Sequence, residues 1–239
     1  MSTFDFAVAF TAIVAGAVAS IAGFGVGSLL TPLLAVPFGA KVAVALVAIP
    51  HAIATFIRLW RLRDSISWPV LRSFGIPSAA GGLVGASIFT QAGGELLARV
   101  LGGLLVFVGI AEVVGVAQRI RFGGATAWIA GAVSGIFGGM VGNQGGIRSA
   151  GLLAFDLPPR EFIATAAVIA LIIDLVRTPL YIWQAGSEML AALRIMTIAT
   201  VGVVVGTFAG SYILLRLPAA VFRRVIGAVL LALGIWLLT

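Results

Sequence analysis

The sequence has no cysteine and little charge. Of its 239 residues, 10% are charged and 61% are hydrophobic, against about 25% charged residues in an ordinary soluble domain. The absence of cysteine excludes disulfides and thiolate metal sites, and a single histidine argues against a structural zinc site. A water-soluble fold of this size cannot bury so many apolar side chains, so we predict that its solvent is the lipid bilayer.

The hydrophobic residues form continuous runs, and many of these runs are about 20 residues long, the length that crosses a bilayer as a helix. A β-barrel would instead alternate apolar and polar residues. We therefore predict an all-α polytopic membrane protein with about eight to ten helical segments. The expected segments are 4–22, 26–38, 42–60, 70–91, 96–118, 124–141, 147–157, 162–183, 190–215 and 219–238.

The net charge of +7 comes from fourteen arginines, Lys41 and eight acids. In a soluble protein this balance would raise the question of nucleic-acid binding. Here most arginines lie at the ends of apolar segments, where they orient a membrane protein. We expect the bilayer as a partner and no nucleic acid.

The chain contains an internal repeat. A shift of 119 residues superposes much of the first half on the second, and a shift of 125 matches the last segments. The arginine pairs Arg58 with Arg177 and Arg99 with Arg224 are the most informative matches. We expect two transmembrane repeats, residues 1–121 and 122–239, each with a short segment, 26–38 or 147–157, that follows a glycine cluster and suits a broken or re-entrant helix.

Charge indicates that the repeats have opposite orientations. The loop between 58 and 72 holds four arginines, whereas its counterpart at 184–188 is neutral to acidic. If basic loops face the cytoplasm, both termini lie outside, and so does the 184–189 loop, while 61–69 and 119–123 lie inside. The charge pattern does not decide whether each short segment is a hairpin or a third crossing.

Nearly the whole chain resembles the sulfite exporter TauE/SafE family of bacterial membrane transporters. The resemblance rests on the glycine-rich break at 23–32, which ends in Pro32, on the second break at 135–146, and on the Leu-Pro-Pro-Arg-Glu sequence at 157–161. It implies a multi-pass protein of the bacterial inner membrane, without a cofactor, that exports sulfite, sulfonates or other small organosulfur or carboxylate anions. Asn143, Gln144 and Arg148 depart from the simpler family pattern, so the substrate stays open.

The two glycine breaks are candidate anion sites. A helix that starts at membrane depth presents unpaired N–H groups and the positive end of its dipole. The candidate substrate-binding residues at the breaks are Gly25, Gly27, Ser28 and Thr31 in the first half and Asn143, Gln144, Gly145 and Gly146 in the second. In the alternative interpretation, the glycines only allow close helix packing, and Ser28 and Thr31 only cap a helix.

Arg148 follows the second break. Its guanidinium offers a fork of donors that suits an oxyanion, although an arginine in a loop can also extend to the membrane surface.

Three more residues are candidates because they are polar within apolar segments. Asp174 and Arg177, spaced i, i+3, are either a structural ion pair or a proton acceptor beside an anion-binding arginine. His51 is either a second proton-coupling candidate or a hydrogen-bonded packing residue. Arg58, the repeat equivalent of Arg177, has Thr55 in place of the acid and lies near Arg61, so we expect it to be a cytoplasmic anchor.

Secondary transport of a small anion, with protons as a possible coupling ion, fits these features best. A passive anion channel would also need a basic constriction. A membrane enzyme has no nucleophile–base pair, metal cluster or nucleotide loop to support it, and a non-transporting accessory protein is the fourth alternative. The sequence does not give the oligomeric state.

Overall fold

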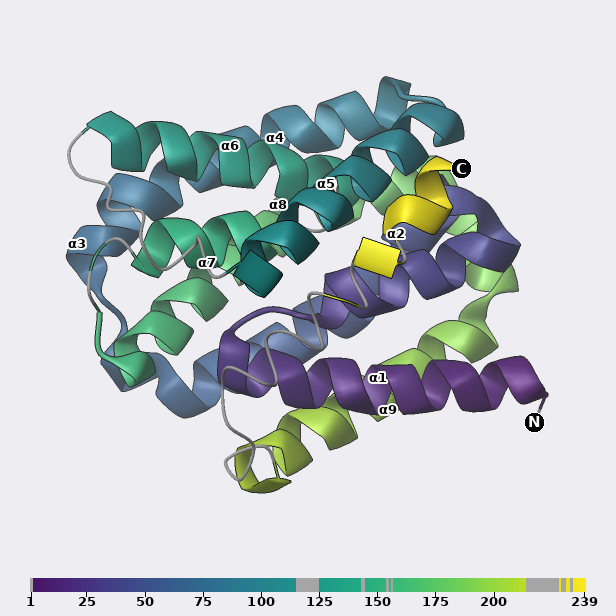
Figure 1. Cartoon of the computed structure of the whole chain (residues 1–239), viewed down its shortest axis with the longest axis horizontal. Coiled ribbons are helices and arrows are strands. Elements are labelled where there is room, and N and C mark those ends of the chain that lie inside the picture. Colours follow the sequence, from purple (N-terminus) through teal and green to yellow (C-terminus); the bar gives the residue numbers. More distant parts are fainter. Residues whose placement is uncertain are drawn as a thin grey trace.

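The computed structural model describes residues 2–114, 125–142, 145–153, 155, 157–213, 228, 231–232 and 234–239. Within these ranges the chain is helical and has no strand, which confirms the all-α class (Figure 1). The helices are α1 (Thr3–Ala22), α2 (Val26–Leu62), α3 (Trp68–Val70), α4 (Ile76–Gln91), α5 (Gly94–Val114), α6 (Ala125–Val141), α7 (Gly145–Leu153), α8 (Pro159–Ala191) and α9 (Leu193–Ile213).

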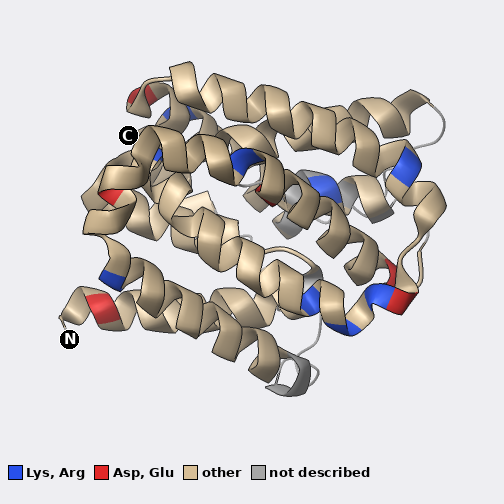
Figure 2. Cartoon of the chain, turned by 180° about the vertical axis from the view of Figure 1, so that it is seen from behind, with Lys and Arg blue, Asp and Glu red and all other residues tan. Residues whose placement is uncertain are grey.

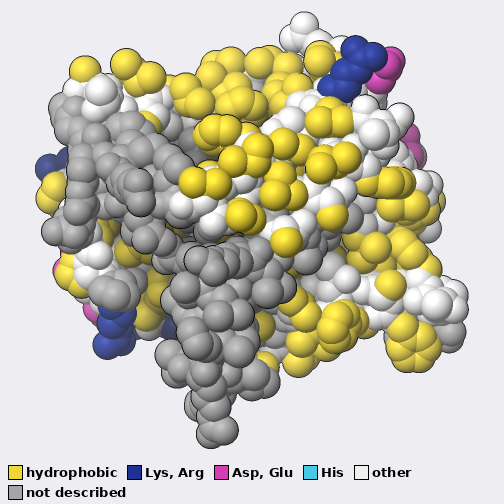
Figure 3. All heavy atoms as spheres, in the orientation of Figure 1, with side chains coloured by type: hydrophobic (Ala, Val, Ile, Leu, Met, Phe, Trp, Pro, Cys, Tyr) yellow, Lys and Arg dark blue, Asp and Glu magenta, His cyan; other side chains and the backbone are white. Residues whose placement is uncertain are grey.

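Six stretches in the described helices are long and apolar enough to cross a bilayer: Thr3–Ser20, Val26–Ser65, Trp68–Gln91, Gly94–Ala111, Arg160–Ala191 and Leu193–Gly210. Their outward faces are apolar as well; Phe10 is 72% exposed and Trp183 is 77% exposed. Figure 3 shows hydrophobic side chains spread over the coloured part of one face. In water such a surface would be unfavourable, so it fits contact with lipid.

Two long helices contain a point with non-helical backbone. In α2 this point is Gly39 (φ 75°, ψ 158°), which divides the helix close to the expected segments 26–38 and 42–60. In α8 it is Ala185 (φ −134°, ψ 22°). We expected a turn at 184–188, and this expectation was wrong, because helical hydrogen bonding resumes after Ala185 and α8 continues to Ala191.

Residues 2–38 form a hairpin that consists of α1 and the part of α2 before Gly39. The two ends of this hairpin lie at the same end of the molecule. Asp5, at the start of α1, pairs with Arg194. Lys41, just after the break in α2, donates a hydrogen bond to the carbonyl of Ala92 (3.2 Å) and interacts electrostatically with Glu188. Because 188 and 194 flank the turn between α8 and α9, both ends of the hairpin lie beside that turn (Figure 1).

The helices α6 and α7 form a second hairpin, at the opposite end. Gly131 of α6 and Gly151 of α7 both pack against Phe74. Phe74 belongs to a π-helical turn (Leu71–Gly75) that follows the turn after α2. The backbone N–H of Ser67, in that same turn, donates to Thr165 near the start of α8 (3.0 Å). The charge pattern did not decide whether each short segment is part of a hairpin or a third crossing. In the structure each is the second arm of a helix hairpin, and the two hairpins begin at opposite ends of the molecule.

Glycines let helices of different halves touch through their backbones. A Cβ added to Gly135 of α6 would lie 2.0 Å from the carbonyl oxygen of Ser78 in α4, and one added to Gly16 of α1 would lie 2.2 Å from that of Val203 in α9. Gly16 and Gly135 are 119 residues apart, and Ser78 and Val203 are 125 apart. The two contacts match under the shifts found in the sequence, as a duplication would predict. The boundary at 121/122 lies outside the described residues, and the division into two repeats stays our proposal.

Candidate functional site

Both helix hairpins turn at glycines with positive φ. Gly23 (φ 77°) ends α1, Gly25 (φ 141°) precedes α2, and Gly142 (φ 69°) follows α6. Residues with a Cβ rarely adopt these angles, so the sequence needs glycine at each position. The first N–H groups of α2 and α7 have no partner within their own helices. Each hairpin therefore presents a helix start to the interior of the protein.

The two breaks touch each other. A Cβ on Gly145, the first residue of α7, would lie only 2.2 Å from the Cβ of Phe24. From the next turn of α7, Nη2 of Arg148 donates to the carbonyl oxygen of Gly23 (3.1 Å). These contacts bring residues more than 100 positions apart into a single site.

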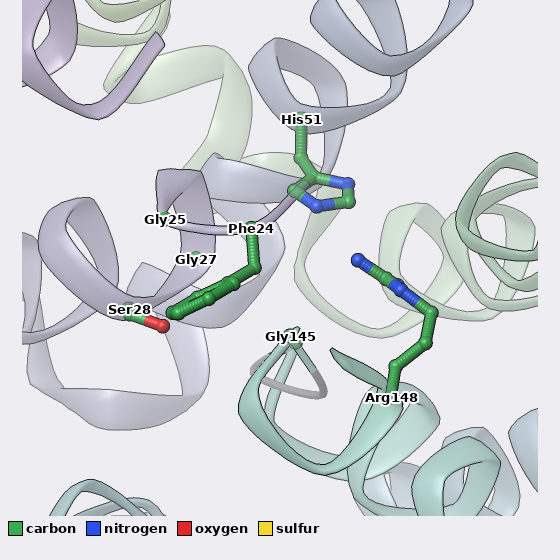
Figure 4. Close-up of a pocket in the computed structure, with 8 residues that line it drawn as sticks. Phe24, Gly25, Gly27, Ser28, His51, Gly145 and Arg148 are labelled. Atoms are coloured by element: carbon green, nitrogen blue, oxygen red, sulfur yellow. The ribbon is translucent and has the colours of Figure 1, made fainter. Parts of the chain in front are cut away.

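A narrow, partly open cavity, with about 10 Å³ of space for the centre of a water molecule, lies where the breaks meet. Figure 4 shows His51 and Arg148 pointing toward the same space, with Phe24 and Ser28 on its other side. The lining residues are Phe24, Gly25, Gly27, Ser28, His51, Gly142, Gly145 and Arg148. The candidates that the sequence predicted separately and that line this cavity are Gly25, Gly27, Ser28, His51, Gly145 and Arg148.

Arg148 is buried, with 1% of its surface exposed, and does not extend to the membrane surface. Apart from the bond to Gly23, its Nε and Nη1 atoms have no hydrogen-bond partner among the described residues. Burial of unpaired guanidinium donors is unfavourable unless an acceptor satisfies them. The arrangement suits an oxyanion, which can accept from both nitrogens.

His51 connects the cavity to a buried ion pair in α8. Its Nδ1 lies 2.6 Å from Oδ2 of Asp174, and Oδ1 of the same carboxylate accepts from Nε of Arg177 at 2.9 Å and lies 2.7 Å from its Nη2. The i, i+3 ion pair expected from the sequence is therefore present. The contact between His51 and Asp174, which are 123 residues apart, had no signal in the sequence.

Arg177 lies behind Gly142 and has its donors occupied. Besides Asp174, it bonds the carbonyl oxygen of Gly138 through Nη1 (2.9 Å), and the hydroxyl of Tyr181 donates to the carbonyl of Gly139. These carbonyls belong to the last turn of α6, and that of Gly138 also accepts from the backbone N–H of Gly142 (3.1 Å). Arg177 and Tyr181 thus hold the second break in place, and Arg177 is not among the residues that line the cavity.

The expectation that Arg58 is a surface anchor was wrong. Its side chain is buried, with 4% exposed. One nitrogen, Nη2, donates to Oγ1 of Thr55 (2.9 Å), and Nη1 has no partner among the described residues. Proximity in sequence to Arg61 suggested a loop, but α2 continues to Leu62 and keeps Arg58 on its inner face.

Thr31 and Gly146 are candidates that do not appear among the described residues lining the cavity. Thr31 is buried in α2 without a described partner for its hydroxyl, and Gly146 lies in α7. The N-cap position of α2 is held by Gly25, which has no side chain, and not by Ser28 or Thr31. Asn143 and Gln144 lie outside the described residues, and their role stays a prediction.

The chemistry of the site is that of binding. In the described part of the chain, no three His, Asp or Glu side chains are grouped so that they could hold a metal ion. The cavity offers guanidinium and backbone N–H donors beside one imidazole. Such a set can hold an oxyanion and exchange a proton with it.

Comparison with known proteins agrees with this geometry. The family model described as Sulfite exporter TauE/SafE matches residues 8–237, nearly the whole chain. No curated protein and no solved structure gives a match.

Proposed function

Because the chain belongs to the TauE/SafE sulfite exporter family, a family of membrane transporters, we propose that it exports a small oxyanion across the bacterial inner membrane. Sulfite, sulfonates and short carboxylates are the candidate substrates. The observation that supports an anion is Arg148, which is buried in the cavity with two guanidinium nitrogens that lack a described partner. A cation substrate would be repelled there.

In this proposal the anion binds near the midplane of the membrane, between the two breaks. Nε and Nη1 of Arg148 donate to its oxygens from one side. The start of α2 at Gly27 and the start of α7 at Gly145 donate from the others, helped by the dipoles of both helices. Asn143 and Gln144, adjacent in sequence to Gly142 and Gly145, are proposed to add amide donors.

Replacing Arg148 with glutamine tests the proposal. We expect sulfite binding to weaken about tenfold or more, because a hydrogen bond to a charged group contributes roughly 1.5–3 kcal/mol and tenfold corresponds to about 1.4 kcal/mol. Titration calorimetry on the purified protein in detergent measures this. Arg63→Gln is the matched control, since Arg63 is exposed and lies outside the cavity. Equal affinity in both variants would show that Arg148 does not bind the anion.

We also propose that the end with the turn at 63–67 faces the cytoplasm. The arginines described there are Arg61, Arg63, Arg72 and Arg160, and the sequence joining α5 to α6 adds Arg119 and Arg121. At the other end each described base has an acid beside it, in the pairs Asp5–Arg194, Glu95–Arg99 and Lys41–Glu188. Figure 2 shows charged residues gathered at the two ends of the molecule, with few between. Basic residues favour the cytoplasmic side.

Single cysteines in this cysteine-free chain test the orientation. We expect Ser187→Cys to react with a membrane-impermeant maleimide on intact cells, and Asp64→Cys to react only after permeabilisation. Both positions are exposed; Ser187 lies near the end of α8 and Asp64 just after the end of α2, at opposite ends of the molecule. Reaction of both from the same side would contradict the topology, including the outward position of the termini.

A further inference from the structure

The buried charges of the described residues do not balance. Three guanidinium groups, those of Arg58, Arg148 and Arg177, are buried, while Asp174 is the one carboxylate buried near them. Asp174 is engaged by Arg177. The second buried acid that the structure describes, Asp5, pairs with Arg194 at the end of the molecule. Two positive charges, on Arg58 and Arg148, are thus left without a described counter-charge.

Arg58 is not among the residues that line the cavity, and lies farther along α2, toward the proposed cytoplasmic end. It follows His51 by seven residues on α2, which is two helical turns and about 10 Å along the same face. Its charge interacts with that of Arg148 as well as with Asp174. Arg148 has two buried nitrogens without a described partner, and Arg58 has one.

Comparison with the repeat equivalent shows why Arg58 is unneutralised. Arg177 donates to Asp174 three residues before it, and Arg58 donates to Thr55 three residues before it. The spacing is the same, but the acceptor in the first half is a neutral hydroxyl. The charge of Arg58 is therefore left to act on something else in the interior.

We propose that Arg58 is the second cationic group of the anion site and makes the site selective for doubly charged oxyanions over singly charged ones. The inference rests on the proposed function and specifies the charge of its substrate. A dianion neutralises both Arg58 and Arg148, whereas a monoanion leaves one buried cation uncompensated. In an environment of low dielectric that difference is large.

Sulfate and methanesulfonate are the probes, because they have similar tetrahedral shape and differ in charge. We expect the wild-type protein in detergent to bind sulfate more tightly than methanesulfonate in a calorimetric titration. Arg58→Gln should weaken sulfate binding about tenfold or more, about 1.4 kcal/mol, and change methanesulfonate binding by about threefold at most. Arg58→Lys should keep the preference for sulfate.

Thr55→Asp provides a second variant that keeps Arg58 in place. It gives Arg58 the acid that Arg177 has in Asp174, and should likewise reduce the preference for sulfate by about tenfold. Arg63→Gln is the control and should leave the preference unchanged. If Arg58→Gln does not fold, Thr55→Asp and Arg58→Lys still decide the question.

The outcomes separate this inference from the proposed function. If the wild type binds neither probe, nor sulfite, the proposed function fails and the inference with it. If Arg148→Gln weakens both probes while Arg58→Gln and Thr55→Asp leave the sulfate preference intact, anion binding stands and the role of Arg58 is overturned. If Arg58→Gln weakens the binding of sulfate and of methanesulfonate equally, the proposed role of Arg58 is also overturned, because the charge selectivity would then depend on other residues.

Discussion

Replacing Asp174 with asparagine is expected to destabilise the folded protein by about 3–5 kcal/mol, the range measured when one partner of a buried ion pair is removed. The carboxylate is fully buried and is the acceptor for both His51 and Arg177. A neutral amide leaves the Arg177 guanidinium without its counter-charge. It also places an N–H₂ group, which cannot accept a hydrogen bond, against the donor of either His51 or Arg177. Thermal unfolding in detergent and the yield of monodisperse protein measure the effect.

Two further variants make the Asp174 test specific. Asp64→Asn removes an exposed carboxylate, with 96% of its side chain accessible, and should leave stability unchanged. Asp174→Asn combined with Arg177→Gln removes both charges and should recover much of the lost stability. Normal stability in the single Asp174→Asn variant would contradict a structural ion pair, and would make Asp174 a candidate to carry the coupling proton.

The membrane class and the helix breaks could be predicted from the sequence because each has a local cause. Continuous apolar runs have one stable solvent, and glycines at positions 23, 25 and 142 are needed for backbone angles that other residues avoid. Charge along the loops predicts that the halves are inverted, and this stays a prediction. These signals depend on neighbouring residues alone, so no tertiary information was needed.

The arrangement inside the site could not be predicted in the same way. Whether an arginine near a helix end points outward or inward depends on where the helix ends, and α2 continues past Arg58 to Leu62. Arg177 and Asp174 were expected as a pair from their spacing, but their contacts with Gly138 and His51 join positions 39 and 123 residues apart. Such contacts depend on how the two hairpins pack against each other, and residue spacing along a single helix does not predict that packing.

We propose that His51 moves a proton together with the anion. Its ring lines the cavity and its Nδ1 contacts Asp174. The charged groups that act on it are Asp174 and Arg177 of α8 and Arg58 of α2, and Arg148 of α7 points toward the same space from across the cavity. Asp174 favours an imidazolium and the three arginines oppose it. A bound anion adds negative charge beside the ring, so it offsets the arginines and lets His51 hold a proton while the substrate is present.

Replacing His51 with glutamine should therefore separate accumulation from exchange. The glutamine amide can still donate to Asp174, so the fold is retained, but it cannot take a proton. In vesicles with an imposed pH gradient we expect gradient-driven accumulation of labelled sulfite to fall at least tenfold, while exchange of labelled for unlabelled sulfite continues, because exchange does not need the proton to cycle. Intact accumulation in the variant would exclude His51 as the proton site. Wild-type flux that itself ignores the gradient would favour a passive anion channel over a proton-coupled carrier.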